Sequence, residues 1–153
     1  GLGAEERGQA EAIAKNLFEM SHLSVPIVNV VIGEGASGGA LGIGVGDRLL
    51  MLENAWFSVI SPEGCAAILW RDSAKAPEAA EAMKPTASDL LDLKIVDELI
   101  KEPSGGAHTN YEEIAATVKK HILKELKVLM SQSCDELIDA RIEKLSSIGA
   151  WTE

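Results

Sequence analysis

Basic residues are scarce in this sequence. Its 153 residues include 14 Lys and Arg against 24 Asp and Glu, which gives a formal net charge of −10 at pH 7. Binding to nucleic acid or to an anionic membrane surface depends on clustered positive charge, and a chain with this balance does not offer it. We therefore expect neither nucleic acid nor a membrane surface as a partner.

Cysteine and long apolar runs are also scarce. Cys65 and Cys134 are too few and too isolated for a disulfide framework or a zinc site, which predicts a reducing, cytoplasmic location and no metal in this chain. No apolar stretch reaches the roughly 18 residues that a transmembrane helix needs. The sequence lacks an initial Met, and helical periodicity starts almost at once, which we interpret as a sign of a fragment.

Hydrophobic periodicity predicts an α/β protein. We expect residues 1–109 to form one α/β unit and residues 110–153 a helical C-terminal extension of the same domain. The β-branched run at residues 25–32 is typical of a strand covered on both faces. Further strands are predicted at 48–52, 56–60 and 95–100, and helices over 4–21, 61–70 and 86–93 and from Ser73, Asn110 and Ser133.

The glycine-dense segment at residues 33–40 is the most informative part of the chain. It follows the first predicted strand and begins a short helix that Asp47 ends. Backbone N–H groups at such a helix start are unpaired, and the helix dipole favours an anion there. The double glycine Gly38-Gly39 favours exposed donors, although glycines also allow a helix and a sheet to pack closely.

The same segment matches the dinucleotide-binding fingerprint, as Gly33-x-Gly35-x-x-Gly38. A dinucleotide unit requires a helix of about ten or more residues before the next parallel strand. Here further glycines interrupt the helix, and it ends within about eight residues. The dinucleotide interpretation is therefore disfavoured.

Other candidate residues have competing interpretations. Ser61 and Pro62 predict a helix start, with Glu63 as an acid in its first turn. Glu63 is a general acid or base if it faces a cleft, and otherwise a charge that complements the helix dipole. Cys65 as a nucleophile needs a partner base, so a structural thiol is favoured. His108 either contacts a ligand or packs its glycine-rich loop.

Blocks of this sequence, in this order, resemble the carboxyltransferase α subunit of bacterial and plastid acetyl-CoA carboxylase. The resemblance extends over nearly the whole chain, and several blocks are long enough to be specific. They are Gly3-Ala4-Glu5-Glu6-Arg7-Gly8-Gln9, residues 31–41, 51–54, 58–66, 68–70 and 79–81, Glu102-Pro103-x-Gly105-Gly106-Ala107-His108, and the closing Ile148-Gly149 with Trp151.

The resemblance implies a crotonase-type fold, in which ββα turns form a spiral followed by C-terminal helices, here incomplete at its N-terminus. It implies a subunit that pairs with a β subunit in an α2β2 assembly. The implied reaction moves a carboxyl group from carboxybiotin, on a biotin carrier protein, to acetyl-CoA and gives malonyl-CoA for fatty acid synthesis. The implied location is the bacterial cytoplasm, with the plastid stroma as the alternative.

The resemblance also gives the glycine segment a ligand, because the ureido oxygen of biotin gains negative charge as the carboxyl group leaves. The N–H groups of Gly38 and Gly39 are predicted to stabilise that charge. The carboxybiotin side is assigned to Gly35, Ala36 and Ser37, and candidate helix-start contacts to Ser61 and Glu63.

One departure from the family and two alternatives remain at this point. Ala36 stands where the family usually has a further glycine, so its methyl group narrows the loop if that position needs a positive φ. One alternative is a carboxyltransferase of another biotin-dependent acyl-CoA carboxylase or decarboxylase. The other is a non-catalytic assembly module.

Overall fold

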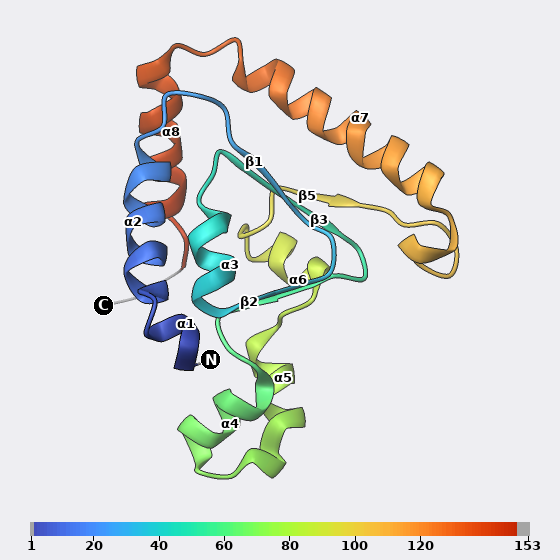
Figure 1. Ribbon diagram of the computed structural model, residues 1–153. Helices are drawn as coiled ribbons and strands as arrows, with labels where there is room; N and C mark the ends of the chain where they lie inside the picture. The colour runs from blue at the N-terminus through green and yellow to red at the C-terminus, as the bar shows by residue number, and fades with distance from the viewer. Residues whose placement is uncertain (1, 150–153) are drawn as a thin grey trace.

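The computed structural model describes residues 2–149, so Trp151 of the closing block lies outside the described residues. Helices surround two small sheets (Figure 1). The elements are α1 Leu2–Glu5, α2 Gln9–Ser21, β1 Val28–Val31, β2 Glu34–Ala36, α3 Ser37–Gly44, β3 Arg48–Leu52, β4 Trp56–Ser58, α4 Pro62–Trp70, α5 Ala76–Met83, α6 Ala87–Asp92, β5 Glu98–Ile100, α7 Tyr111–Leu129 and α8 Cys134–Ser146, with 3-10 turns at Ser73–Lys75 and Ala107–Thr109.

The strands form two separate parallel sheets, and successive strands along the chain alternate between them. One sheet has the order β1-β3-β5, and the other pairs β2 with β4. All three strand pairs are parallel. Because β1–β2–α3 is followed by β3–β4–α4, each ββα turn adds one strand to each sheet. This is the spiral arrangement that the family resemblance implies.

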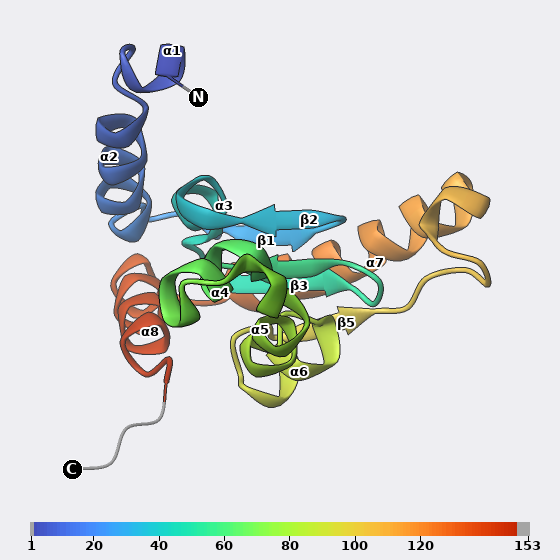
Figure 2. The same ribbon diagram turned by 90° about the horizontal axis from the view of Figure 1, so that it is seen from below.

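The core lies on β3, the middle strand of the larger sheet. Leu50 and Met51 are completely buried there, and α7 packs along β1 and β5 (Figure 2). The expectation that β1 is covered on both faces is wrong for this chain. All four of its residues are only half-buried, because β1 is an edge strand, and Ile32 after it is 71% exposed.

Several predicted boundaries differ from the observed ones. The helix predicted over residues 4–21 is divided into α1 and α2, because Gly8 adopts a left-handed conformation with φ 80°. The helix predicted from Ser73 begins with a 3-10 turn. The helix starts at Asn110 and Ser133 are confirmed, since each side chain accepts a hydrogen bond from the backbone N–H three residues later.

A buried ion pair fixes α8 to the sheet. Arg141 is 1% exposed, and its Nε donates to Oδ1 of Asp47 at 2.8 Å while Nη2 donates to Oδ2 at 3.0 Å. Asp47 in turn accepts from the N–H of Ile27 at 2.6 Å. The guanidinium also donates to the carbonyl oxygens of Met20, Leu23 and Val25. No sequence pattern indicates this pair, apart from the position of Asp47 at the end of the glycine-rich helix.

Replacing Arg141 with Met removes the cation and leaves the buried carboxylate of Asp47 unpaired. Loss of one partner from a buried ion pair costs about 3–5 kcal/mol. We expect the free energy of unfolding of the chain, measured by urea titration with circular dichroism, to fall by that amount. Arg7→Met, at an exposed position, is the matched control and should change it by less than about 0.5 kcal/mol. Equal losses for the two variants would contradict this role of Arg141.

A second charged cluster holds α7 against the sheet. Nζ of Lys124 donates to Glu98 at 2.9 Å. Nδ1 of His121 lies 3.2 Å from the other carboxylate oxygen, although the alignment is poor for a hydrogen bond. The buried Glu125 pairs with Arg48 of β3 at 2.9 Å. Burial opposes ionisation of Glu98, but Lys124 and His121 outweigh it, so the pKa of Glu98 is lowered from its ordinary value.

The lowered pKa of Glu98 makes this contact sensitive to acid. A carboxylate whose pKa is lower in the folded state stabilises the fold above its unfolded value, here about 4.5, and that contribution is lost as the pH falls through the folded value. We expect the urea midpoint to fall below this pH, and to fall less steeply in Glu98→Gln. The exposed Glu81→Gln should keep the slope of the unmodified chain. If Glu98→Gln kept it too, the cluster would not contribute to acid sensitivity.

Candidate functional site

The glycine segment begins as a strand rather than a loop. Gly35 lies opposite Phe57 in the β2–β4 pair, and Ala36 lies opposite Ser58. A Cβ on Gly35 would stand 2.7 Å from Cδ2 of Phe57, which is closer than real Cβ contacts come. Gly35 is therefore required by packing against β4.

The strained residue of the segment is Ser37, not Ala36. Ala36 is extended, with φ −141°, so its methyl group needs no unusual backbone. Ser37 follows it with φ 60°, a left-handed conformation that costs a residue with a side chain of order 1–3 kcal/mol. The segment therefore does contain a residue with positive φ, but that residue is Ser37 and not Ala36. No residue-type signal in the sequence distinguishes the two positions.

Helix α3 begins at Ser37, and its first turn carries the backbone N–H donors that the sequence predicts. Ala36 is the N-cap and has no side-chain oxygen with which to satisfy them. A Cβ on Gly38 would lie 3.5 Å from Cδ1 of Ile13, in ordinary contact with α2. At Gly39 no described atom outside its own helix and neighbours comes within 4 Å of that position. Close packing therefore accounts for part of the glycine pattern, and Gly39 is open.

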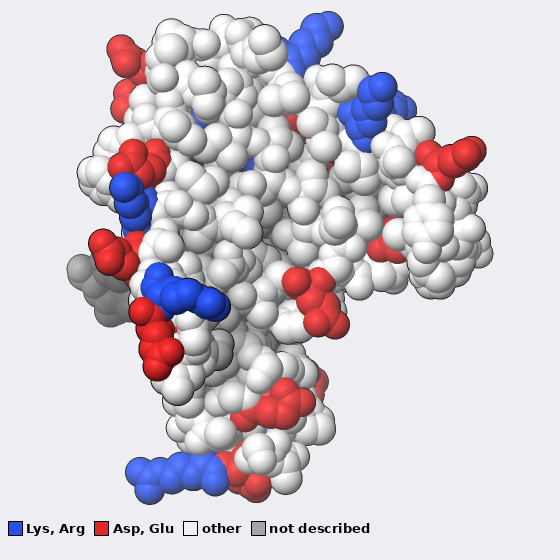
Figure 3. All heavy atoms as spheres, viewed as in Figure 1, with Lys and Arg blue, Asp and Glu red and all other residues white. Residues whose placement is uncertain are grey.

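Gly39 opens into a groove of about 500 Å³, which we call the glycine groove. Its lining is mostly apolar, and Ile43 of α3, which is part of it, exposes 66% of its surface. Figure 3 shows one face of the molecule, on which charged side chains stand mostly toward the edges. The polar side chains that line the glycine groove are those of Asn29 and Glu34, and its other lining residues are Val30, Val31, Ile32, Gly33, Gly35, Ala36, Gly39, Ala40, Ile43, Gly44, Leu49 and Phe57.

Ser61 and Glu63 belong to a separate part of the molecule. Ser61 caps α4, since its Oγ accepts from the N–H of Gly64 at 3.1 Å, and Glu63 is an exposed acid in the first turn. Helix α4 packs chiefly on α5 and the 3-10 turn before it. Neither residue lines the glycine groove, so the structure gives them the capping role and does not bring them to the site.

Ser37 and Gly38 adjoin the glycine groove in sequence but are not among its lining residues, and His108 also lies outside it. His108 is exposed beside Gly106, in a loop that Glu102 holds by accepting from the N–H groups of Asn54 and Ala107. Burial opposes ionisation of Glu102, but these hydrogen bonds outweigh it and lower its pKa. The dinucleotide fingerprint is divided between β2 and an eight-residue α3, which does not form the required βαβ unit.

Two alanine substitutions distinguish Gly35, which packs against Phe57, from Gly39, which has free space where a Cβ would stand. Gly35→Ala should destabilise the chain by about 1–3 kcal/mol, because its Cβ meets the ring of Phe57. Gly39→Ala should stabilise it by up to about 1 kcal/mol, because alanine favours the helix and meets no neighbour. Urea titration measures both changes. Phe57→Leu should rescue Gly35→Ala, and failure of that rescue would contradict the assigned contact.

The parallel ββα turns and the glycine-rich helix start define this chain as part of a crotonase-like fold. Among solved structures, a Pseudomonas malonate decarboxylase hetero-tetramer matches with a TM-score of 0.73 at 16% identity, over 96% of this chain and 59% of the other. The transcarboxylase 12S core matches with a TM-score of 0.68 at 21% identity, over 86% and 26%. At these identities the likeness shows the fold.

The chain belongs to the acetyl co-enzyme A carboxylase carboxyltransferase-like family, whose sequence model matches residues 1–149. An acetyl-CoA carboxylase carboxyl transferase subunit alpha from Chlorobium phaeobacteroides (strain DSM 266) is 58% identical over all 153 residues, which cover 46% of that protein. The subunit from Campylobacter curvus is 56% identical over the same residues, or 49% of its length. The chain thus spans about half the length of these relatives.

Two further findings concern the described residues alone. Among residues 2–149, no helix is both long enough and apolar enough to cross a membrane. Within the same part of the chain, no three His, Cys, Asp or Glu side chains gather closely enough to hold a metal ion.

Proposed function

We propose that this chain is the carboxybiotin-facing part of the carboxyltransferase α subunit of acetyl-CoA carboxylase. The observation that carries the proposal is the open position at Gly39, in the first turn of α3 and on the wall of the glycine groove. Family membership supports the reaction, because the relatives carry the name of that subunit. The product is malonyl-CoA.

The glycine groove would hold the flat ureido ring of carboxybiotin, whose ureido oxygen would gain negative charge as the carboxyl group leaves. The N–H group of Gly39, on the wall of the groove, would donate to this oxygen, and the N–H group of Gly38, one residue earlier in the same turn, would support it. The helix dipole at this start favours the negative charge. The mostly apolar wall excludes water, which strengthens those hydrogen bonds. Gly35 and Ala36 shape the wall, and Ser37 orients the helix start.

The proposal includes partners and a location. A carboxyltransferase β subunit completes the active site in an α2β2 assembly, and a biotin carrier protein delivers the carboxybiotin. The proposal also includes residues 110–153 in the same domain as the spiral, which is supported within the described residues by the packing of α7 on β1 and β5 and of α8 on α2. The bacterial relatives favour a bacterial cytoplasm.

The two alternatives are weaker. The solved neighbours include a transcarboxylase and a decarboxylase, but they share only the fold with this chain. The relatives at 56–59% identity match this chain over all 153 residues, and their names favour acetyl-CoA as the acceptor. A non-catalytic assembly module would have no use for an open glycine beside the helix start.

The proposal is tested in a reconstituted enzyme. Residues 1–153 replace the matching segment of the Chlorobium phaeobacteroides α subunit, and this hybrid is combined with the β subunit of that organism. The measurement is carboxylation of free biotin by malonyl-CoA. We expect activity that requires both subunits and falls by about a hundredfold or more in Gly39→Val, because the added methyl groups block access to the N–H donors.

Gly3→Val is the matched control, because its Cβ also meets no neighbour and it lies on α1, away from the glycine groove. It should keep full activity, and Gly39→Val should still co-purify with the β subunit. Gly38→Val is less informative, since its side chain presses on Ile13. Binding of the β subunit without turnover in the unmodified hybrid would favour the assembly module, and full activity of Gly39→Val would refute the oxyanion site.

A further inference from the structure

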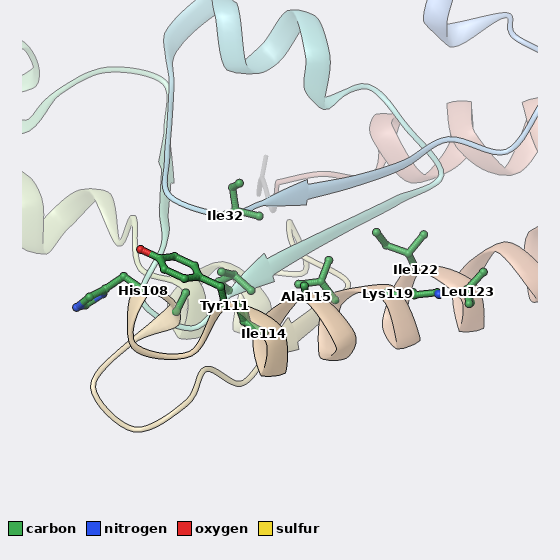
Figure 4. A pocket seen from close by; sticks show the side chains of 11 residues that line it. Ile32, His108, Tyr111, Ile114, Ala115, Lys119, Ile122 and Leu123 are labelled. Carbon is green, nitrogen blue, oxygen red and sulfur yellow. The ribbon is translucent and has the colours of Figure 1, made fainter.

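Helix α7 is held differently at its ends and in its middle. Ile114 near its start and Leu129 at its end are buried, whereas the apolar residues between them are half-buried or exposed. The middle of the helix therefore depends on its ion pairs with β3 and β5. It also forms one wall of a second groove, of about 650 Å³, with Ile32 on the opposite side (Figure 4). A movement of α7 would change the width of this groove.

One polar contact in the middle of α7 is incomplete. Nδ1 of His121 and Oε2 of Glu98 lie 3.2 Å apart, both atoms are buried, and no described residue gives either of them a well-aligned hydrogen bond. A buried polar atom without a partner costs stability. If His121 carries a positive charge, its attraction to the carboxylate does not require exact alignment. The contact is therefore weak while His121 is neutral and stronger once it is protonated.

Few other charged groups surround this contact. The elements that pack most closely on α7 are β1, which has no titratable residue, β5, whose one titratable residue is Glu98, and the 3-10 turn at residues 107–109. That turn carries His108, which precedes the start of α7 and lies far along the helix from His121. The remaining charges lie on α7 itself or reach it from β3, and they are Lys124, Glu125 and Arg48.

The partners of His121 keep their charges in mild acid. The lowered pKa of Glu98 keeps its carboxylate ionised there. Hydrogen bonds to Glu98 and Glu125 raise the pKa of Lys124, so its ammonium group stays charged as well. Histidine is the side chain that ordinarily titrates near pH 6.5, at about the middle of this range. A change from mild acid to mild base therefore alters the charge of His121 and leaves that of Glu98 as it is.

We propose that His121 and Glu98 form a pH-sensitive contact, in which protonation of His121 draws the middle of α7 onto β5 and loss of that proton loosens it. A histidine that gains an anionic partner in the folded state stabilises the fold while it is protonated, and this contribution is lost as the pH rises. Lys124 keeps its own bond to Glu98, so α7 loosens without detaching. The wall of the second groove loosens with it. This inference does not depend on the proposed function.

Hydrogen exchange of the α7 amides, measured by mass spectrometry, tests the proposal on residues 1–153 within the hybrid α subunit. Protection factors are compared, because they correct for the intrinsic effect of pH on exchange. We expect protection of α7 to fall about three- to tenfold between about pH 5.5 and about pH 8, the factor that one net hydrogen bond accounts for. His121→Gln should show equal protection at both pH values. His22→Gln is the matched control, since His22 is exposed at the end of α2, and it should keep the full response.

Glu98→Gln is a second variant that separates the level of protection from its dependence on pH. It should lower protection at both pH values, because Lys124 loses its partner, and it should remove the response to pH. Equal protection of α7 at both pH values in the unmodified subunit would overturn the inference. So would a response that persists in His121→Gln or Glu98→Gln, or one that is equally large in α2, which would report a change of the whole fold. Turnover is not measured, so the outcome is independent of the carboxyltransferase assay.

Discussion

The buried contact between Arg141 and Asp47 connects α8 to the starts of β1 and β3. Asp47 stands between α3 and β3, and it also accepts the N–H of Ile27, just before β1. Arg141 brings α8 to this point and donates to three carbonyl oxygens, one in the last turn of α2 and two in the segment that joins α2 to β1. Removing either charge would leave the other buried and unpaired, which is far more costly than losing a surface pair. The position of α3, and with it the glycine groove, follows from this contact.

The next turn of the spiral uses the same arrangement. Asp97 precedes β5 as Asp47 precedes β3, and it accepts the N–H of Leu49 at 2.6 Å. Lys144, one turn along α8 from Arg141, donates to Asp97. An aspartate before a strand thus binds the neighbouring strand and a cation of α8 in both turns. The second pair is more exposed, so solvent screens it and its contribution is smaller. Helix α8 therefore holds the register of β1, β3 and β5 at one end of the sheet.

Local patterns were sufficient to predict most of the elements, although not strand β2, and they did not predict how exposed the elements are. The caps at Asn110 and Ser133 and the strand at residues 48–52 depend on adjacent residues, so the sequence indicates them directly. The exposure of β1 depends on which strands pair with it, and an apolar run does not contain that information. Arg141 could not be recognised either, because its partner lies 94 residues away and single sequences carry no signal for such pairs.

The candidate site was also only partly predictable, because it consists of backbone groups and the sequence shows only side chains. A search for nucleophiles and bases led to Cys65, Glu63 and His108, none of which lines the glycine groove. A site made of backbone donors leaves only a glycine pattern in the sequence, and that pattern combines several roles. Gly35 is explained by the ring of Phe57, whereas nothing in the described chain presses on Gly39. An anion that approaches a bare peptide needs open space of this kind. Gly33 also meets no neighbour, but it precedes β2, so Gly39 is the glycine of the helix start that packing leaves unexplained.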